Sequence, residues 1–319
     1  MQTAVVAGGA GFIGSSLSKS LLSNGYKVAC IDSLITGDRK NIKDLLNNSR
    51  FEFIEEDITS SEFRVRSSKL DYIFDLASPA SPNKKSKRSY INHPIETLLA
   101  NSLGTYNLLE LSKERGARFL YASSSEIYGD PSVSPQSEEY FGNVNPNGVR
   151  SVYDEAKRFG EALTMSYVRN FGTDARIVRI FNTYGPNMQA DDGRVVSNFI
   201  NQAISSKPIT IYGNGSQTRS FCYVEDMIDG LRRAMFVGKT KGEVINVGNP
   251  DERTILDLAE LIKEMTNSSS EIVFEELPED DPKSRNPDIS KAKRIIDWEP
   301  TVEINEGLKK TIEYFKSLI

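Results

Sequence analysis

A glycine-rich segment near the amino terminus constrains the fold of this chain more than any other feature. Gly8, Gly11 and Gly14 lie in residues 8–14, GGAGFIG, directly after the apolar run Thr3–Ala7. Glycines at this spacing let the backbone turn tightly from a strand into a helix, so that amide groups at the helix start can approach a pyrophosphate. The order strand, turn, helix therefore predicts a dinucleotide-binding fold.

Short apolar strands alternate with amphipathic helices through the first half of the chain, which predicts an α/β fold with a doubly wound, parallel sheet of the Rossmann type. We expect strands at Thr3–Ala7, Lys27–Asp32, Phe51–Glu55, Tyr72–Leu76, Phe119–Ser123 and Arg176–Ile180, and helices starting near Ile13, Asn41, Ile95 and Val152. The second half is less regular, with helices predicted at Ser197–Ser205, Val224–Val237, Ile255–Thr266 and Leu308–Leu318, and strands at Ile209–Tyr212, Val244–Val247 and Glu271–Glu275.

These elements predict two intimately joined parts. We expect a dinucleotide-binding Rossmann domain over residues 1–181 and a smaller, mainly substrate-binding region over residues 182–319. The chain is expected to return to the first domain around residues 219–248. A chain of 319 residues is long enough to bury a large core in such an arrangement.

Composition excludes several classes of function. The net charge of −5 argues against nucleic acid as the main partner. No apolar run approaches the ~20 residues that a membrane span needs, and we expect neither a signal peptide nor a membrane partner, which favours the cytoplasm. The only histidine is His93, before Pro94, so a site with several histidine ligands is excluded and no metal is expected. Acid–base chemistry must therefore rest mainly on Tyr, Lys, Glu, Asp or Arg side chains.

The end of the second predicted strand indicates which dinucleotide binds. Asp32 lies 18 residues after Gly14, where a carboxylate accepts hydrogen bonds from the adenosine ribose and repels a 2′-phosphate. NAD is therefore favoured, although Arg39 in the following loop leaves NADP as an alternative. Asp57 and Ile58 follow the third strand, where an adenine contact and a simple turn aspartate are both open interpretations.

Tyr153 and Lys157 are the candidate catalytic pair. They lie four residues apart at the start of a predicted helix, and hence on one helical face. A phenol has an unperturbed pKa of ~10, and a fixed ammonium group nearby favours the phenolate that could accept a proton from a sugar hydroxyl. Ser124, Ser125 and Glu126 follow the strand Phe119–Ser123, at the sheet edge where active sites of such folds form.

These motifs together resemble the extended short-chain dehydrogenase/reductase superfamily, and further blocks resemble its UDP-glucuronate decarboxylases (UDP-xylose synthases). The resemblance covers nearly the whole chain. The further blocks are ASPASP at 77–82, EIYGDP at 126–131, PQSE at 135–138, RIFNTYGP at 179–186, DGRVVSNF at 192–199, YGNGSQTR at 212–219, NPDI at 286–289 and WEP at 298–300.

The resemblance implies a reaction without net redox change. Tyr153 would take the proton of the sugar 4-hydroxyl while hydride passes from C4 to NAD, and Lys157 would lower the pKa of the tyrosine and hold the nicotinamide ribose. The 4-keto sugar then loses its C6 carboxylate as carbon dioxide, with Glu126 and Arg285 acting around the carboxylate and C5. Hydride returns to C4, which yields UDP-xylose. Ser125 would hydrogen-bond the sugar throughout.

The resemblance also implies binding residues. Those for the cofactor are Gly8, Gly11, Phe12, Ile13, Gly14, Asp32, Asp57, Ile58, Leu76, Ser78, Tyr153 and Lys157. Those for the substrate are Ser124, Asn182, Arg194, Asn198, Tyr212, Arg219 and Arg285. Arg219 is expected at the diphosphate, because a guanidinium fork suits phosphate oxygens.

The predicted helix from Val152 also bears on assembly. It carries an apolar stripe that would pack on the sheet in a monomer. The stripe consists of Ala156, Phe159, Gly160, Leu163 and Tyr167. In the resembling family this helix joins a two-fold four-helix bundle, which implies a homodimer.

One segment departs from the family. Residues 83–92, NKKSKRSYIN, form a longer and strongly basic loop after Pro82. It is either a solvated loop or a place where Lys84 or Lys85 reaches an anionic substrate, so an N-acetylated or otherwise C2-modified uronate stays open.

Three other functions share parts of this pattern. A nucleotide-sugar 4,6-dehydratase would place an acidic residue where Ser125 stands, and a 4-epimerase does not usually carry a glutamate at position 126. A catalytically inactive NAD-binding sensor would have little reason to keep Tyr153, Lys157, Ser125 and Glu126 together.

Overall fold

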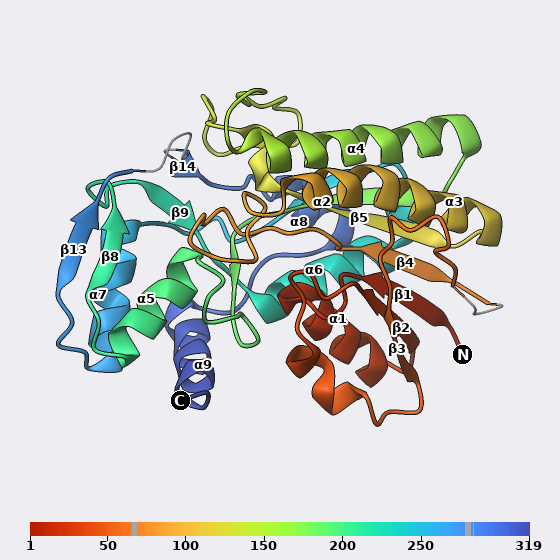
Figure 1. Ribbon diagram of the computed structural model, residues 1–319. Coiled ribbons are helices and arrows are strands. Elements are labelled where there is room, and N and C mark those ends of the chain that lie inside the picture. The colour runs from red at the N-terminus through yellow and green to blue at the C-terminus, as the bar shows by residue number, and fades with distance from the viewer. Residues whose placement is uncertain (66–68, 278–281, 283) are drawn as a thin grey trace.

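A parallel sheet of the described residues forms the centre of the molecule (Figure 1). The computed structural model describes residues 1–65, 69–277, 282 and 284–319. Seven strands in this part of the chain pair in the order β11-β6-β5-β4-β1-β2-β3. They are β1 (Thr3–Ala7), β2 (Lys27–Asp32), β3 (Phe51–Glu55), β4 (Tyr72–Asp75), β5 (Arg118–Ser124), β6 (Ala175–Ile180) and β11 (Val244–Val247). The predicted doubly wound α/β class is confirmed.

Helices cover both faces of the sheet (Figure 1). One face packs against α3 (Thr105–Arg115) and α4 (Ser151–Phe171), with α2 (Pro94–Leu99) alongside α4. A π-helical turn over Ala100–Gly104 joins α2 to α3. The other face packs against α1 (Phe12–Ser23) and α6 (Val224–Phe236), with α8 (Ser290–Ile296) beside β11.

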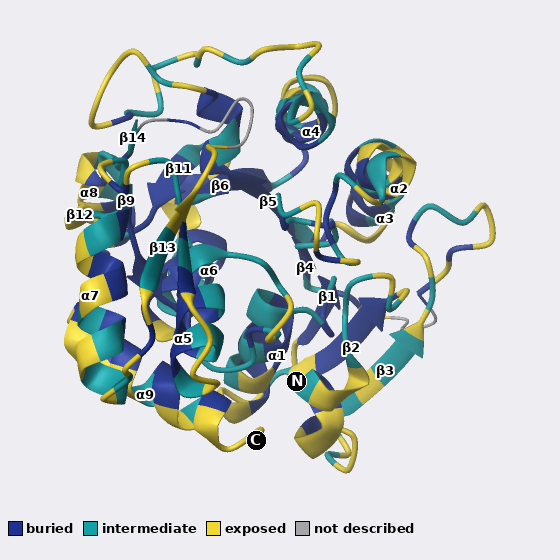
Figure 2. Ribbon diagram, turned by 60° about the vertical axis from the view of Figure 1, so that its left-hand side comes forward, coloured by how far each residue is buried: buried dark blue, intermediate teal, exposed yellow. Residues whose placement is uncertain are grey.

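The strands are apolar because helices cover both of their faces. All five residues of β1 are buried, whereas β3 at the edge of the sheet contains no fully buried residue (Figure 2). The strand order reverses between β1 and β4, and a crevice for a ligand forms at the carboxyl ends of strands at such a point.

The second part of the chain packs beside this sheet. It contains α5 (Val195–Ile204), α7 (Ile255–Thr266), α9 (Ile304–Lys316) and the parallel pair β8 (Ile209–Tyr212) and β13 (Ile272–Glu275). Two small sheets complete it: β7 (Thr183–Tyr184) with β10 (Cys222–Tyr223), and β12 (Glu252–Thr254) with β9 (Thr218–Ser220) and β14 (Ser284–Arg285). One hydrophobic core runs from the α1–α6 face of the sheet into this part.

The structure differs from the sequence prediction in local detail. The segment expected as a helix near Asn41 is a 3₁₀ helix over Arg39–Leu45, and a second short one covers Gly238–Thr240. The sequence pattern does not predict the short strands β7, β9, β12 and β14 or the helix α8. The return of the chain at α6 and β11 adds the outermost strand to the sheet. None of the helices in the described parts is long and apolar enough to cross a membrane.

Candidate active site

The glycine turn brings the ends of β1 and β4 together. Gly8 has φ +74°, a conformation that favours glycine, and a Cβ there would lie 2.7 Å from the carbonyl oxygen of Leu76. A Cβ at Gly14 would overlap the carbonyl oxygen of Gly8. Glycine is therefore required at both positions for the turn to lie this close to the loop after β4.

The amino terminus of α1 offers free amides to an anion. Its N-cap residue, Gly11, provides no side-chain cap, and the first turn contains no acidic residue. Asp32, at the end of β2, lies behind this turn, and its carboxylate accepts hydrogen bonds from the amides of Ala10 (2.9 Å) and Leu34 (2.8 Å). Burial raises the pKa of Asp32 despite these two bonds. The uncapped helix start and the glycine turn fit the pyrophosphate of NAD.

One cavity of about 700 Å³ contains most of the residues predicted from the sequence. The predicted cofactor residues in its wall are Gly8, Gly11, Phe12, Ile13, Gly14, Leu76, Ser78, Tyr153 and Lys157. The predicted substrate and catalytic residues in its wall are Ser124, Ser125, Glu126, Asn182, Arg194, Asn198, Tyr212 and Arg219. Segments far apart in the sequence thus meet at a single site.

Four predicted residues, Asp32, Asp57, Ile58 and Arg285, lie outside the wall of this cavity. Asp57 is exposed and accepts hydrogen bonds from the amide and the hydroxyl of Thr59 (both 2.8 Å), which is the geometry of a turn aspartate. Ile58 is buried in the core below α3.

Arg39, the residue that kept NADP as an alternative cofactor, contacts side chains of β3. It forms an ion pair with Glu55 and lies 5.0 Å from the centroid of the Phe53 ring. Its guanidinium group is therefore turned toward β3.

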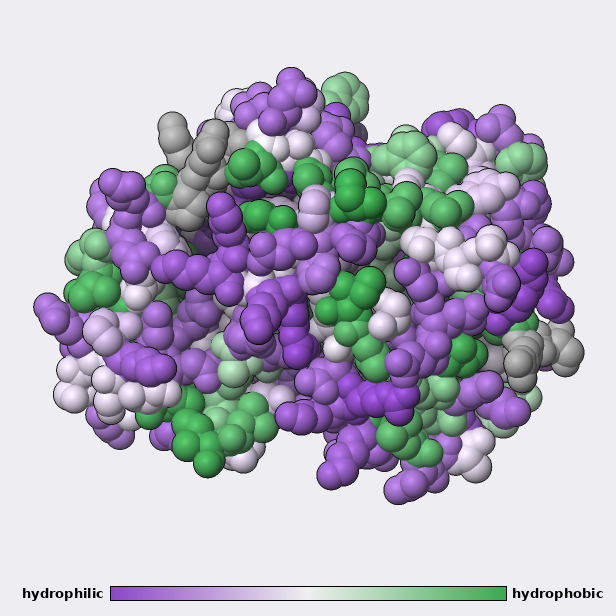
Figure 3. Space-filling model, viewed as in Figure 1, coloured by the Kyte–Doolittle hydropathy of each residue, from purple (hydrophilic) through white to green (hydrophobic). Residues whose placement is uncertain are grey.

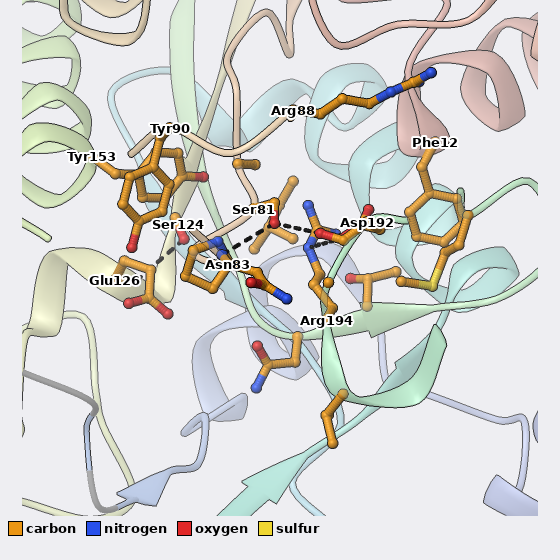
Figure 4. Close-up of a pocket in the computed structure, with 18 of the residues that line it drawn as sticks. Phe12, Ser81, Asn83, Arg88, Tyr90, Ser124, Glu126, Tyr153, Asp192 and Arg194 are labelled. Carbon is orange, nitrogen blue, oxygen red and sulfur yellow. Dashed lines mark hydrogen bonds and ion pairs between the residues drawn. The ribbon is translucent and has the colours of Figure 1, made fainter. Parts of the chain in front are cut away.

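The carboxyl end of β5 brings predicted catalytic residues to one end of the cavity. Ser124 accepts a hydrogen bond from the amide of Glu126 at 3.2 Å and caps a 3₁₀ helix over Ser125–Tyr128. This short helix turns Ser125 and Glu126 toward the start of α4, which carries Tyr153. Figure 4 shows Ser124, Glu126 and Tyr153 grouped on one side of the cavity.

Lys157 is held firmly beneath Tyr153. Its ammonium group donates to the carbonyl oxygen of Ala122 (2.8 Å) and lies 5.0 Å and 5.7 Å from the ring centroids of Tyr121 and Tyr153. Burial lowers the pKa of Lys157 to about 8, although Asp75 raises it.

The pKa of Tyr153 differs from the sequence prediction. Lys157 was expected to lower it, whereas in the protein alone burial raises it to about 12, against a hydrogen bond with Ser124 and the charge of Arg194. The difference arises because the phenol is almost completely enclosed, which disfavours its anion.

Glu126 is bound by two guanidinium groups. It forms ion pairs with Arg150 and with Arg285, whose Nη2 lies 3.2 Å from the Glu126 Oε2. Burial would raise the pKa of Glu126, yet Arg285 and Arg150 together hold it at about 2. Glu126 is therefore ionised at neutral pH in the protein alone.

Other predicted substrate residues line the same cavity. Arg194 forms an ion pair with Asp192 (3.2 Å), and Asn198 donates to the carbonyl oxygen of Gly193 (3.0 Å). Arg219 in β9 donates to the carbonyl oxygens of Thr218 and Pro282. Asn182 follows β6, and Tyr212 ends β8.

The basic segment forms part of the cavity wall. Lys84 and Lys85 line it, and Lys85 also lies 3.4 Å from Glu275. Arg88 donates to the carbonyl oxygen of Thr36 (3.2 Å) and lies 3.9 Å from Asp191. The segment thus connects the loop after β2 with the loop before α5, and Figure 4 shows Arg88 far from Tyr153.

Sequence reasoning missed several residues in the wall of this site. Tyr90, within the basic segment, stacks on Tyr153, with ring centroids 5.0 Å apart and an interplanar angle of 12°. Arg150 precedes α4, and Asp192 precedes the Gly193 turn. The only signal was their proximity in sequence to predicted residues, because no motif marks a side chain that acts through a contact between distant segments.

Proteins of known family and structure share this fold. Residues 4–248 match the NAD dependent epimerase/dehydratase family. Among solved structures, UDP-glucuronic acid 4-epimerase from Bacillus cereus, in complex with UDP-glucuronic acid and NAD, has a TM-score of 0.86 and 32% identity, with 100% of both chains covered. UDP-glucose 4-epimerase from Thermotoga maritima has a TM-score of 0.88 and 30% identity, with 99% of both covered. The chain belongs to the NAD dependent epimerase/dehydratase family.

Curated relatives indicate which enzymes of this family the chain resembles. UDP-glucuronic acid decarboxylase 1 of Xenopus tropicalis is 46% identical, over 98% of this chain and 72% of the relative. UDP-glucuronic acid decarboxylase 3 of Arabidopsis thaliana is 49% identical, over 98% of this chain and 88% of the relative. The resemblance to the UDP-glucuronate decarboxylases noted in the sequence is confirmed, and NAD is the cofactor that the family and the glycine turn indicate.

Proposed function

We propose that this protein decarboxylates UDP-glucuronate to UDP-xylose with NAD as cofactor. The observation that carries the proposal is the grouping of Ser125, Glu126, Tyr153 and Lys157 beside the glycine turn in one cavity. The similarity to UDP-glucuronic acid decarboxylases over nearly the whole chain supports the same activity.

Tyr153, Ser124 and Lys157 have separate roles in the oxidation at C4. NAD, held at the glycine turn, would supply the hydride acceptor for C4 of the sugar and, once reduced, the hydride donor that restores it. Tyr153 accepts the proton of the 4-hydroxyl group, and Ser124, which hydrogen-bonds the phenol, holds that hydroxyl in reach. Lys157, fixed on the carbonyl of Ala122, places its positive charge below the ring.

The carboxylate leaves once C4 is a ketone, because the electrons of the C5–C6 bond then move onto the ketone oxygen. Glu126 lies next to Ser125 in the cavity wall, and the proposal places C5 and C6 of the sugar beside it. Glu126 is ionised in the protein alone. Its carboxylate can therefore accept a hydrogen bond or a proton there, but it has no proton to donate. C5 then gains a proton from solvent water in place of the carbon dioxide lost, and Tyr153 returns its own proton to the 4-oxygen as hydride returns to C4.

Two alternatives remain as outcomes of the same test. A related UDP-uronate with a substituent at C2 is supported by Lys84 and Lys85, which line the cavity. A 4-epimerase activity is supported by the likeness to the Bacillus cereus enzyme named above.

The experiment is mass analysis of the products after purified protein is incubated with NAD and UDP-glucuronate, with an N-acetylated UDP-uronate in parallel. Loss of carbon dioxide to give a UDP-pentose supports the proposal. An isomer of unchanged mass would mean epimerisation, and a protein that binds NAD but leaves UDP-glucuronate intact would overturn the named substrate. Absorbance of reduced cofactor during turnover would reveal release of the 4-keto pentose.

We also propose that the protein is a homodimer. Large hydrophobic side chains are exposed along α2, α3, α4 and the turn that joins α2 to α3, and hydrophobic residues gather over these helices in the space-filling view (Figure 3). They are Ile95, Leu98, Leu99, Leu103, Tyr106 and Phe159. Of the predicted stripe on α4, Ala156, Gly160 and Tyr167 are buried against the sheet side, whereas Phe159 is 52% exposed. A second copy of these helices would cover that face.

A cytoplasmic location is part of the same proposal. Both cysteines, Cys30 and Cys222, are buried as free thiols. A chain that needs no disulfide is typical of a reducing compartment.

A further inference from the structure

Two arginines share Glu126, but they are not equivalent. Arg285 is 1% exposed, donates from Nη1 to the carbonyl oxygen of Ser125 (2.7 Å), and lies in β14. Its own carbonyl oxygen accepts a hydrogen bond from the hydroxyl of Ser220 (2.9 Å). Arg285 therefore lies behind Glu126, outside the wall of the cavity, and is fixed on both sides.

Arg150 faces the cavity. Its side chain, 11% exposed, lines the wall and pairs with the same carboxylate oxygen of Glu126 that Arg285 contacts. Its backbone is anchored, because its carbonyl oxygen accepts hydrogen bonds from the amides of Tyr153 (3.0 Å) and Asp154 (3.1 Å). A guanidinium group is thus presented to the cavity three residues before the catalytic tyrosine.

An additional anion near Glu126 would need a positively charged partner. Asp154, which follows Tyr153, is also buried, and its Oδ1 has no hydrogen-bond partner among the described residues. Burial and the charge of Glu126 raise its pKa, while Arg150 and Arg285 lower it. A uronate would bring another carboxylate to this end of the cavity, and an unpaired carboxylate in a buried site is costly. Arg150 is the cation of this cluster that both lines the wall and lies beside Tyr153.

We propose that Arg150 receives the carboxylate of the uronate and thereby selects a uronate over a neutral sugar. The inference rests on the proposed function, because it takes a nucleotide-linked uronate as the ligand. On binding, Arg150 shares or exchanges its contact with Glu126 for the ligand carboxylate, and Arg285 keeps Glu126 paired. Two carboxylates then face two guanidinium groups. After the carboxylate leaves as neutral carbon dioxide, Arg150 returns fully to Glu126.

If Arg150 binds the substrate carboxylate, its replacement should weaken the binding of UDP-glucuronate more than that of UDP-xylose. A charge-assisted pair with the substrate carboxylate is present from the moment the substrate binds, so its loss appears mainly as weaker binding. In Arg150→Gln, UDP-glucuronate should bind about 10- to 100-fold more weakly. UDP-xylose, which has no carboxylate, should weaken by no more than about 3-fold. In turnover, the rise in KM should exceed the fall in kcat.

The experiment is titration calorimetry of both ligands with NAD-loaded wild-type protein and variants, followed by steady-state kinetics. Arg169→Gln is the matched control, because it removes the same charge from the exposed last turn of α4. Arg150→Lys restores the positive charge but not the paired N–H donors of the guanidinium group, so it should recover part of the lost affinity for the uronate.

Equal weakening of both ligands would overturn the inference, since that is what a displaced Glu126 or a distorted α4 would cause. Unchanged affinity for UDP-glucuronate in Arg150→Gln would overturn it too. If Arg150→Gln fails to fold, Arg150→Lys carries the test, because a selective loss of uronate affinity is expected there in smaller degree. The binding measurements need no turnover: wild-type protein that binds the uronate through Arg150 but releases no carbon dioxide contradicts the proposed function and leaves this inference standing.

Discussion

The ring of Tyr90 lies almost flat against the ring of Tyr153, with centroids 5.0 Å apart and an angle of 12° between the planes. Figure 4 shows the two rings side by side above Glu126. Tyr90 is 1% exposed, and its hydroxyl has no hydrogen-bond partner among the described residues. The basic segment thereby closes one side of the phenol of the candidate catalytic residue Tyr153, and this enclosure keeps the phenol neutral in the protein alone.

Replacement of the phenol hydroxyl should separate chemistry from binding. Tyr153→Phe keeps the stack on Tyr90 but removes the proton acceptor, so turnover of UDP-glucuronate should fall by about 10²- to 10⁴-fold or more. NAD affinity, measured by calorimetry, should change far less. Tyr90→Phe is the matched control, with the same change on the neighbouring ring and a smaller expected loss. Turnover retained in Tyr153→Phe would remove this residue from the mechanism.

The ionisation of Tyr153 should be visible in the spectrum of the protein without cofactor. Because burial raises its pKa to about 12, the phenol stays protonated as the pH rises through 10 and becomes tyrosinate only near 12. The ultraviolet absorbance difference between wild type and Tyr153→Phe should therefore show tyrosinate only above about pH 11. Tyrosinate that appears in this difference near pH 7 would mean that the ammonium group of Lys157, not burial, controls the phenol in the free protein.

The glycine turn offers a test of the cofactor site. Gly14→Ala would place a methyl group on the carbonyl oxygen of Gly8, so the turn must shift. We expect a loss of about 1–3 kcal/mol in the free energy of unfolding and a loss of NAD binding. Gly238→Ala is the control, because a Cβ there has nothing within 4 Å and its φ is not positive. Equal NAD affinity in the two variants would contradict the role given to this turn.

Sequence reasoning succeeded where a local rule applied. The strands of the parallel sheet, the glycine turn and the helix that carries Tyr153 follow from periodicity and from residues that lie close in sequence. Arg285 shows the limit of such rules: the family resemblance indicated its role, but its place behind Glu126 depends on β14 pairing with β9, two short strands with too few residues to show a pattern.

The pKa of Tyr153 and the wall residue Arg150 show a second limit. Spacing placed Lys157 beside the phenol, but burial, which outweighs that charge, comes from Tyr90 and other residues distant in sequence. Arg150 contacts Glu126 across 24 positions, and no alternation or motif marks such a pair. A pKa that depends on burial, or a contact between distant segments, can be assigned only when the packing is known.

The exposed apolar face gives a prediction about assembly. Leu103→Glu places a charge among hydrophobic side chains that a second copy would cover, so the variant should elute as a monomer in size-exclusion chromatography with light scattering. Leu46→Glu is the control, since Leu46 is 44% exposed, close to the 42% of Leu103, and lies away from that face after the 3₁₀ helix Arg39–Leu45. A wild type that is monomeric at micromolar concentration would contradict the homodimer.

The ion pairs of Glu126 give a prediction about stability and pH. Burial opposes its ionisation, but Arg285 and Arg150 hold its pKa at about 2, below the 4.5 of an ordinary glutamate. A carboxylate with a depressed pKa stabilises the folded state above pH 4.5, and that stabilisation is lost as the pH falls toward 2. Glu126→Gln should therefore lower the free energy of unfolding by on the order of 3 kcal/mol near pH 7. Urea unfolding of the cofactor-free protein should show this difference shrinking by more than half by about pH 3. Glu55→Gln, which removes a half-exposed partner of Arg39, should cost less than about 1 kcal/mol at any of these pH values. A difference for Glu126→Gln that stays constant from about pH 7 to about pH 3 would mean that the carboxylate is not held in its ionised form by the two arginines.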